Sequence, residues 1–217
     1  MKTLQKMGGV SALLMAAAYA VIMLIFIVVL NYPSITDPMQ KMALVAAQPN
    51  MIFLTNILGY VLFGVLLVVL SLALHDRLKE SSTGMLQVAV VLGIIWAASL
   101  VASGMVSNAA IAPSVALYAS DPAMAANNWS LIETISGGLG NANGEILGGL
   151  FTLLISWAAL RSGKLPRVLN IIGLLVGAVG IVSLAPMLNS LAMVFGVLQI
   201  VWFVWLGVVL LSQPKKA

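Results

Sequence analysis

Cysteine is absent from the 217-residue sequence, and histidine occurs once, at His75. The first absence excludes disulfide bonds, thiolate metal sites and cysteine nucleophiles, and the second excludes sites built from several imidazoles. Charged residues are also scarce, at 7% of the chain against roughly 25% in a typical soluble domain. So few charges cannot provide a hydrated surface, which excludes a soluble enzyme, a disordered tail and a secreted disulfide scaffold.

Hydrophobic residues make up 62% of the chain, and the mean hydropathy is +1.12. A helix of about 20 apolar residues crosses the ~30 Å hydrocarbon core of a bilayer. Six segments meet this criterion, so we predict an all-α polytopic membrane helix bundle that forms a single domain over residues 1–217. The predicted transmembrane spans are 9–30, 51–74, 85–105, 139–160, 168–187 and 191–211.

The basic residues predict how this bundle is oriented. Lys and Arg are enriched in short cytoplasmic loops. With both termini in the cytoplasm, nine of the ten basic residues are cytoplasmic and only Lys41 is outside. The sequence therefore predicts an N-in, C-in protein, and the net charge of +4 reflects this orientation rather than a nucleic-acid partner.

The apolar run at the N-terminus is longer than the hydrophobic region of a secretory signal peptide. Such a region has about 7–15 residues, whereas the run here continues from residue 9 to residue 30. We therefore expect an uncleaved first span.

Two connections on the outer side are long. Asp37 is a suitable N-cap and Pro38 suits the first helical position, so the first connection is predicted to hold a short interfacial helix. The second connection, 108–138, is long for a connector, and such loops often act as lids or binding segments. Tyr32 and Trp129 fit an aromatic belt at the membrane interface.

Glycines four residues apart on two predicted spans indicate close helix packing. Small residues at this spacing form a groove that lets a second helix approach. The packing glycines are Gly140, Gly144 and Gly148 on one span, and Gly173 and Gly177 on the next.

One acidic residue lies inside a predicted span. Counted back from Arg161 at 1.5 Å per residue, Glu145 lies about 24 Å from the inner boundary, in the outer leaflet. An ionisable residue in a span is a functional candidate by default, and polar groups in hydrocarbon need partners or water. We therefore predict an outward-facing pocket around Glu145 that binds or conducts a small polar solute, a cation or a proton. Its expected lining residues are Asn56, Tyr60, Asn108, Asn141 and Gln199.

Two other interpretations of these residues remain open. Asn and Gln often join membrane helices by hydrogen bonds worth about 0.6–2 kcal/mol. The protein would then be a structural or accessory protein without catalytic activity that binds a protein partner or lipid. A membrane enzyme with Glu145 as general acid or base is the least favoured interpretation, because the sequence contains no catalytic, metal-binding or cofactor motif.

Several segments resemble one known family. They are GEILGGLF (144–151), SWAALRSGKLPR (156–167), GLLVG (173–177), QIVWFVWLG (199–207) and LALHDRLK (72–79). Together they resemble a bacterial family of six-span membrane proteins catalogued only as a domain of unknown function. The resemblance covers nearly the whole chain and is most specific over 144–167. It implies a single six-span domain in a bacterial inner membrane, and it implies no activity, cofactor or site residue.

Overall fold

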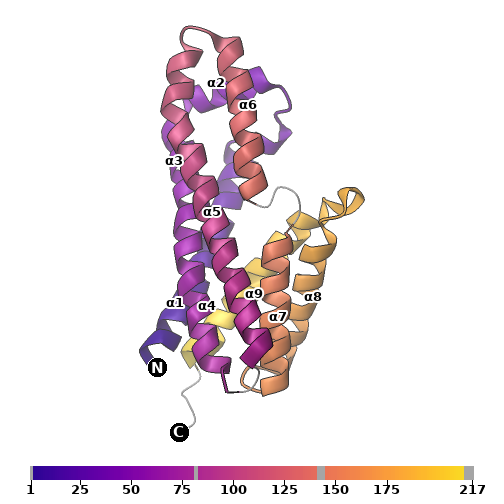
Figure 1. The fold of residues 1–217 in the computed structure, drawn as a ribbon. Helices are drawn as coiled ribbons and strands as arrows, with labels where there is room; N and C mark the ends of the chain where they lie inside the picture. The colour runs from indigo at the N-terminus through magenta and orange to yellow at the C-terminus, as the bar shows by residue number, and fades with distance from the viewer. Residues whose placement is uncertain (1, 81–82, 141–144, 213–217) are drawn as a thin grey trace. The chain divides into compact units, whose positions relative to one another are not determined.

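The computed structural model describes residues 2–80, 83–140 and 145–212 (Figure 1). These segments are helical over nearly their whole length and contain no β-strand, which confirms the all-α prediction. Four helical stretches are long and apolar enough to cross a membrane. They are Thr3–Val29, Pro49–Leu78, Gly84–Ser120 and Leu191–Ser212.

Two of these stretches change their helical winding along their length. The first consists of α1 (Lys2–Met23) and a π-helical segment, Leu24–Val29. The second consists of α3 (Pro49–Asn56), a π-helical segment (Ile57–Leu62) and α4 (Phe63–Leu78).

The predicted spans 139–160 and 168–187 correspond to shorter helices. These are α7 (Ile146–Ser162) and α8 (Arg167–Val182), which have 17 and 16 residues. The predicted span 139–160 is wrong at its start, because helix α6 ends at Leu139 and α7 begins only at Ile146. Glycine at 137, 138 and 140 has low helix propensity, which favours a helix end there. The last predicted span agrees closely with α9 (Leu191–Ser212).

The connection 108–138, which is predicted to be a long outer loop, is helical over most of its length. Helix α5 (Thr83–Tyr118) continues for 36 residues through Pro113, and α6 (Pro122–Leu139) follows after a short turn. Proline inside a helix removes one backbone hydrogen bond. The residues on both sides of Pro113 are mostly alanine, valine, isoleucine and leucine, and they continue the helix.

An aspartate followed by a proline starts both α2 (Pro38–Ala47) and α6. The Asp37 carboxylate accepts a hydrogen bond of 3.1 Å from the Met39 backbone N–H. The Asp121 carboxylate accepts one of 3.0 Å from the Met124 backbone N–H. In both helices a proline follows the aspartate at the first helical position. A backbone N–H at that position has no acceptor within the helix, so proline, which lacks this group, loses no hydrogen bond there.

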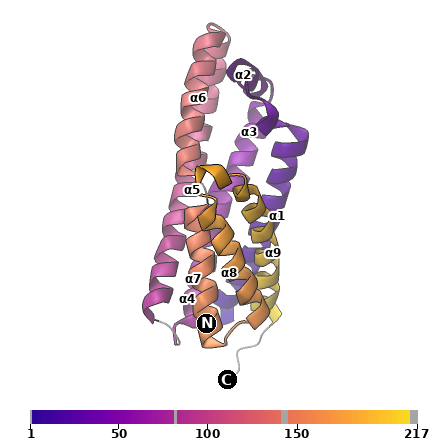
Figure 2. The ribbon, with the colours of Figure 1, turned by 90° about the vertical axis from the view of Figure 1, so that its right-hand side faces the viewer.

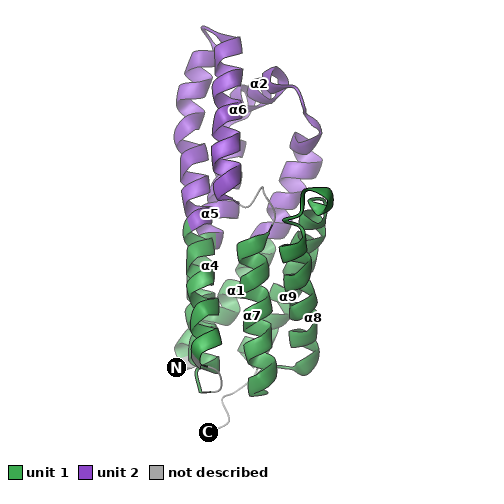
Figure 3. Cartoon of the chain, turned by 45° about the vertical axis from the view of Figure 1, so that its right-hand side comes forward, with its two compact units in different colours: residues 1–17, 64–98, 141–217 green, residues 18–63, 99–140 purple. Residues whose placement is uncertain are grey.

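The chain divides into two compact units (Figure 3). Unit 1 comprises residues 1–17, 64–98 and 141–217, and unit 2 comprises residues 18–63 and 99–140. In unit 1, α7 packs against α8, and α8 packs against α9 (Figure 2). Large side chains of α9 such as Trp202 and Phe203 are buried there.

In unit 2, α2 packs against α6. Met42 and Val45 of α2 are fully buried and belong to a core cluster with Ala125, Ala126 and Trp129 of α6. The apolar side of α2 is therefore covered by another helix of the same unit.

Candidate functional site

Glu145 directly precedes α7 and occupies its N-cap position, with φ −88° and ψ 49°. Its backbone N–H donates a 3.0 Å hydrogen bond to Ser183 Oγ, and the Ser183 hydroxyl donates to the Gly180 carbonyl at 2.7 Å. Ser183 is fully buried just after the end of α8. The end of α8 therefore fixes the position of the Glu145 backbone.

The Glu145 side chain, unlike the Glu145 backbone, is not held by a hydrogen bond. A carboxylate at an N-cap commonly accepts a hydrogen bond from the second or third helical N–H, but the Glu145 carboxylate does not. It makes no hydrogen bond or ion pair with residues 2–80, 83–140 or 145–212. The side chain is partly buried. Glu145 is thus a fixed, partly buried carboxylate that has no partner in the described chain.

Gln199 lies in the interior of unit 1. Its side-chain N–H donates to Thr152 Oγ1 at 2.9 Å, and its Oε1 lies 3.2 Å from the same hydroxyl. Both residues are fully buried. Thr152 follows Glu145 by seven residues along the chain, which corresponds to about 10 Å of helix. Gln199 therefore pairs with α7 about two turns beyond Glu145.

The other predicted lining residues include three in unit 2. Asn56 Nδ2 donates to Asn108 Oδ1 at 2.9 Å and thereby joins α3 to α5. Asn108 Nδ2 in turn donates to the Phe53 carbonyl at 3.4 Å. Tyr60 packs against Gly104 of α5, where an added Cβ would lie 2.7 Å from Tyr60 Cβ. These polar side chains connect neighbouring helices of unit 2.

The predicted residues therefore fall into two groups. Asn56, Tyr60 and Asn108 belong to unit 2, whereas Glu145 and Gln199 belong to unit 1. Asn141 lies outside the described residues, as does Gly144. The described amides are engaged in hydrogen bonds, so Glu145 is the member of the set whose charged group remains available.

The described glycines of the predicted packing motifs all lie against neighbouring groups. An added Cβ at Gly177 would lie 2.7 Å from the Gly149 carbonyl oxygen, so α7 and α8 approach each other through their backbones. An added Cβ at Gly173 would collide with the Ser156 side chain. At Gly148 the neighbour is the Trp96 ring, at 2.8 Å, and at Gly140 it is Ser103 Oγ, at 2.8 Å.

A second polar cluster, in unit 2, was not predicted from the sequence. The Tyr32 hydroxyl donates to Glu133 Oε1 at 2.6 Å and accepts a 2.9 Å hydrogen bond from Trp129 Nε1. Lys41 Nζ lies 3.2 Å from Glu133 Oε2 and 5.2 Å from the centre of the Tyr32 ring. We call these four residues the unit 2 network. It joins the segment after the first span to α2 and α6.

The aromatic members of the unit 2 network are hidden from solvent, whereas the side chains of Lys41 and Glu133 are 25% and 26% exposed. Tyr32 is 6% exposed and Trp129 is 3% exposed, so they form part of the core of the unit rather than an exposed aromatic belt. Burial, reinforced by the hydrogen bond to Glu133, raises the pKa of the Tyr32 hydroxyl well above its usual range. Tyr32 therefore stays neutral and acts as a hydrogen-bond donor. One sequence signal was available for this network: Lys41 and Glu133 are opposite charges on the same predicted side.

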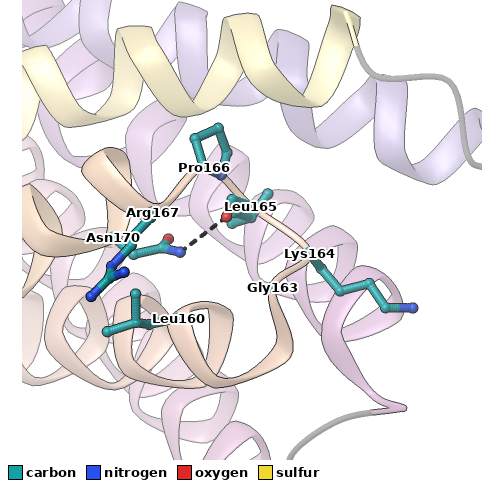
Figure 4. Close-up of a pocket in the computed structure, with 7 residues that line it drawn as sticks. All are labelled: Leu160, Gly163, Lys164, Leu165, Pro166, Arg167 and Asn170. Carbon is teal, nitrogen blue, oxygen red and sulfur yellow. Dashed lines mark hydrogen bonds between the residues drawn. The ribbon is translucent and has the colours of Figure 1, made fainter.

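A cavity of about 610 Å³ lies at the turn between α7 and α8 (Figure 4). Inside it, Asn170 Nδ2 donates to the Leu165 carbonyl at 3.3 Å, and the Arg167 side chain lies beside Asn170. The Lys164 side chain extends away from this pair and forms a 2.6 Å ion pair with Glu80. The cavity is thus lined by a guanidinium group and a carboxamide group beside apolar side chains. The cavity is lined by Leu160, Gly163, Lys164, Leu165, Pro166, Arg167 and Asn170.

Neither protein-family models nor curated proteins nor solved structures give a match to this chain.

Proposed function

We propose that the protein is a six-span membrane protein of the inner membrane that binds a small cation or a proton at Glu145, from the outer side. The four long apolar stretches supply four spans, and α7 and α8 supply the other two. Both termini lie in the cytoplasm in this arrangement, and α2 lies at the outer surface. The basic-residue asymmetry and the resemblance to a bacterial six-span family support it.

The observation that carries the binding site is the Glu145 carboxylate. Its backbone is held by Ser183, yet its charged group has no partner among the described residues. A partly buried carboxylate without a partner is unfavourable unless a cation, a proton or water neutralises or solvates it. A small cation or a proton is the simplest species that would neutralise the charge of this carboxylate.

The proposed site is smaller than the pocket predicted from sequence. Asn56, Asn108 and Gln199 are assigned to helix association, because each is satisfied by a neighbouring helix. These amides thus have a structural role in joining helices, whereas the proposed binding role is assigned to Glu145. Among the described residues, no group of three or more His, Asp or Glu side chains could hold a metal ion, so a monodentate, weakly held cation is proposed.

The experiment compares wild-type protein with Glu145→Gln in nanodiscs. The melting temperature is measured across pH, and in sodium, potassium, magnesium or calcium chloride against choline chloride at constant ionic strength. Ligand binding to the folded state raises the melting temperature by mass action. We expect a rise with at least one cation or with falling pH in the wild type, and its loss in Glu145→Gln.

Glu80→Gln is the matched control, because Glu80 is an exposed loop carboxylate with 67% side-chain exposure. It should keep the wild-type response. A wild type that responds to neither cations nor pH, or a Glu145→Gln protein that keeps the full response, would rule out the site.

The topology has its own test. The chain has no cysteine, so single cysteines can be introduced without background. A cysteine at Ser34 should react with an impermeant thiol reagent in intact cells, and a cysteine at Ser162 should react only after lysis. The opposite pattern would overturn the proposed orientation.

A further inference from the structure

A groove of about 660 Å³ runs between α1 and α4 within unit 1. Met7, Val10 and Leu14 of α1 form one wall, and Leu66 and Val69 of α4 form the other. The α1 side chains in this set are about half exposed. Both helices belong to stretches that are long and apolar enough to cross a membrane. In the proposed membrane arrangement, on which this inference rests, the groove therefore faces lipid.

The two helices are in close contact beside the groove. An added Cβ at Gly8 would collide with the Cβ of Ala73, so α1 and α4 approach nearly to backbone distance there. Such an approach leaves a concave seam on either side of the contact line. The groove is thus a property of the packed helices and not of a flexible loop.

One end of the groove is polar. Thr3 and Lys6 line it there, and Lys6 is exposed. Within the described chain, no hydrogen bond or ion pair engages the Lys6 amine. A lysine at the end of an apolar helix extends its amine toward the lipid headgroups. The groove therefore has an apolar floor that ends in one uncompensated positive charge.

The length of the groove is compatible with a lipid acyl chain. Thr3 and Leu14 are eleven residues apart on one helix, which corresponds to about 16 Å. A single leaflet contributes about half of the ~30 Å hydrocarbon thickness. The apolar wall from Met7 to Leu14 covers about 10 Å of this length, so it can hold most of one acyl chain, with the Lys6 amine at the level of the phosphate.

We propose that this groove binds one anionic phospholipid of the adjacent leaflet, with an acyl chain between α1 and α4 and the phosphate against Lys6. An anionic lipid is favoured because the Lys6 charge has no counter-ion in the described structure. A zwitterionic lipid would bring its own ammonium group close to Lys6. Attraction of anionic lipid by one lysine near the surface corresponds to a preference of roughly fivefold.

Native mass spectrometry of the full-length protein tests this inference. The protein is mixed with phosphatidylglycerol and phosphatidylcholine of identical chains, and the ratio of the singly bound species is measured. We expect a preference for phosphatidylglycerol of about fivefold in the wild type, which falls to about parity in Lys6→Gln. Lys79→Gln, which removes an exposed lysine paired with Asp76, should keep the preference.

A second variant tests the groove itself. Val10→Trp places a large side chain in the groove from a position that is 47% exposed, so it should fold normally. It should lower the binding of both lipids. An excess of inorganic phosphate should not displace the lipid; displacement would indicate a site for the free anion instead.

Several outcomes would overturn the inference. They are an unchanged lipid ratio in Lys6→Gln, an equal loss of preference in Lys79→Gln, and full lipid binding in Val10→Trp. The inference is independent of the cation site, because Glu145→Gln should leave the lipid ratio unchanged.

Discussion

The fully buried pair Thr152 and Gln199 of unit 1 is neutral, whereas unit 2 places a charged pair, Lys41 and Glu133, in its network. The ion pair between Lys164 and Glu80 in unit 1 is more exposed, at 36% and 67% of the two side chains. Unit 1 also brings backbones together at Gly149 and Gly177. Neutral hydrogen bonds and glycine contacts suit a segment surrounded by lipid, since buried charges are strongly unfavourable there. The charged network of unit 2 requires access to water, which fits a segment that reaches beyond the hydrocarbon.

The largest effect is expected at the glycine contact of unit 1. Gly177→Ala should lower the free energy of unfolding by about 3 kcal/mol, because the added methyl group meets backbone atoms of α7 that cannot move aside. Denaturation by SDS in mixed micelles measures this change. Gly84→Ala is the control in the same unit, since nothing lies within 4 Å of its added Cβ, and it should cause no loss. Equal stability of the two variants would contradict the close approach.

The buried neutral pair of unit 1 comes next. Gln199→Leu should lower the free energy of unfolding by about 2 kcal/mol, because it leaves the Thr152 hydroxyl buried without a partner. Adding Thr152→Val removes that unsatisfied hydroxyl. The double variant should therefore be more stable than Gln199→Leu alone. A simple sum of the two single losses would show that the residues do not interact.

In unit 2, Tyr32→Phe should lower the free energy of unfolding by about 1.5 kcal/mol. It removes a hydrogen bond to the charged Glu133 and leaves the Trp129 indole N–H without its acceptor. Tyr118→Phe is the control in the same unit and should be nearly neutral. If both variants lose the same stability, the hydroxyl of Tyr32 has no special role.

The same residue of unit 2 predicts that the stability depends on pH in the alkaline range. The folded-state pKa of Tyr32 is raised, chiefly by burial and then by the hydrogen bond to Glu133. Its stabilising effect is therefore complete below the unfolded pKa of about 10, and it declines as the pH rises above that value. The free energy of unfolding should fall more steeply above pH 10 in the wild type than in Tyr32→Phe. Parallel pH curves would show that Tyr32 titrates normally.

The smallest effect is expected for the ion pair between Lys164 and Glu80 at the surface of unit 1. The Glu80 side chain is 67% exposed, and water screens the pair. Glu80→Gln should change the free energy of unfolding by less than about 0.5 kcal/mol. A larger loss would indicate that charge pairs matter in unit 1 as they do in unit 2.

Local patterns predicted much of the secondary structure. The apolar run 191–211 predicted the first residue of α9 and placed its last residue within one position of Ser212. Asp37 and Pro38 correctly marked the start of α2. The same pair at Asp121 and Pro122 starts α6, although the length of that connection favours a loop.

The partners of the polar residues could not be predicted from local patterns. Tyr32 and Glu133 are 101 positions apart, and Thr152 and Gln199 are 47 apart. Such pairs depend on which helices pack together, and the helical period of a single sequence carries no information on that choice. The depth of a polar residue within a predicted span therefore showed that residues such as Asn56 and Gln199 need partners, but it did not show which residues those partners are.

The shortness of α7 and α8 has a consequence for the bilayer in the proposed six-span arrangement. With 17 and 16 residues they extend for about 26 and 24 Å, which is less than the ~30 Å of an average hydrocarbon core. Helices shorter than the hydrocarbon thickness draw the two lipid surfaces together around them. The protein should therefore thin the membrane beside these two helices, and its stability should depend on the chain length of the surrounding lipids.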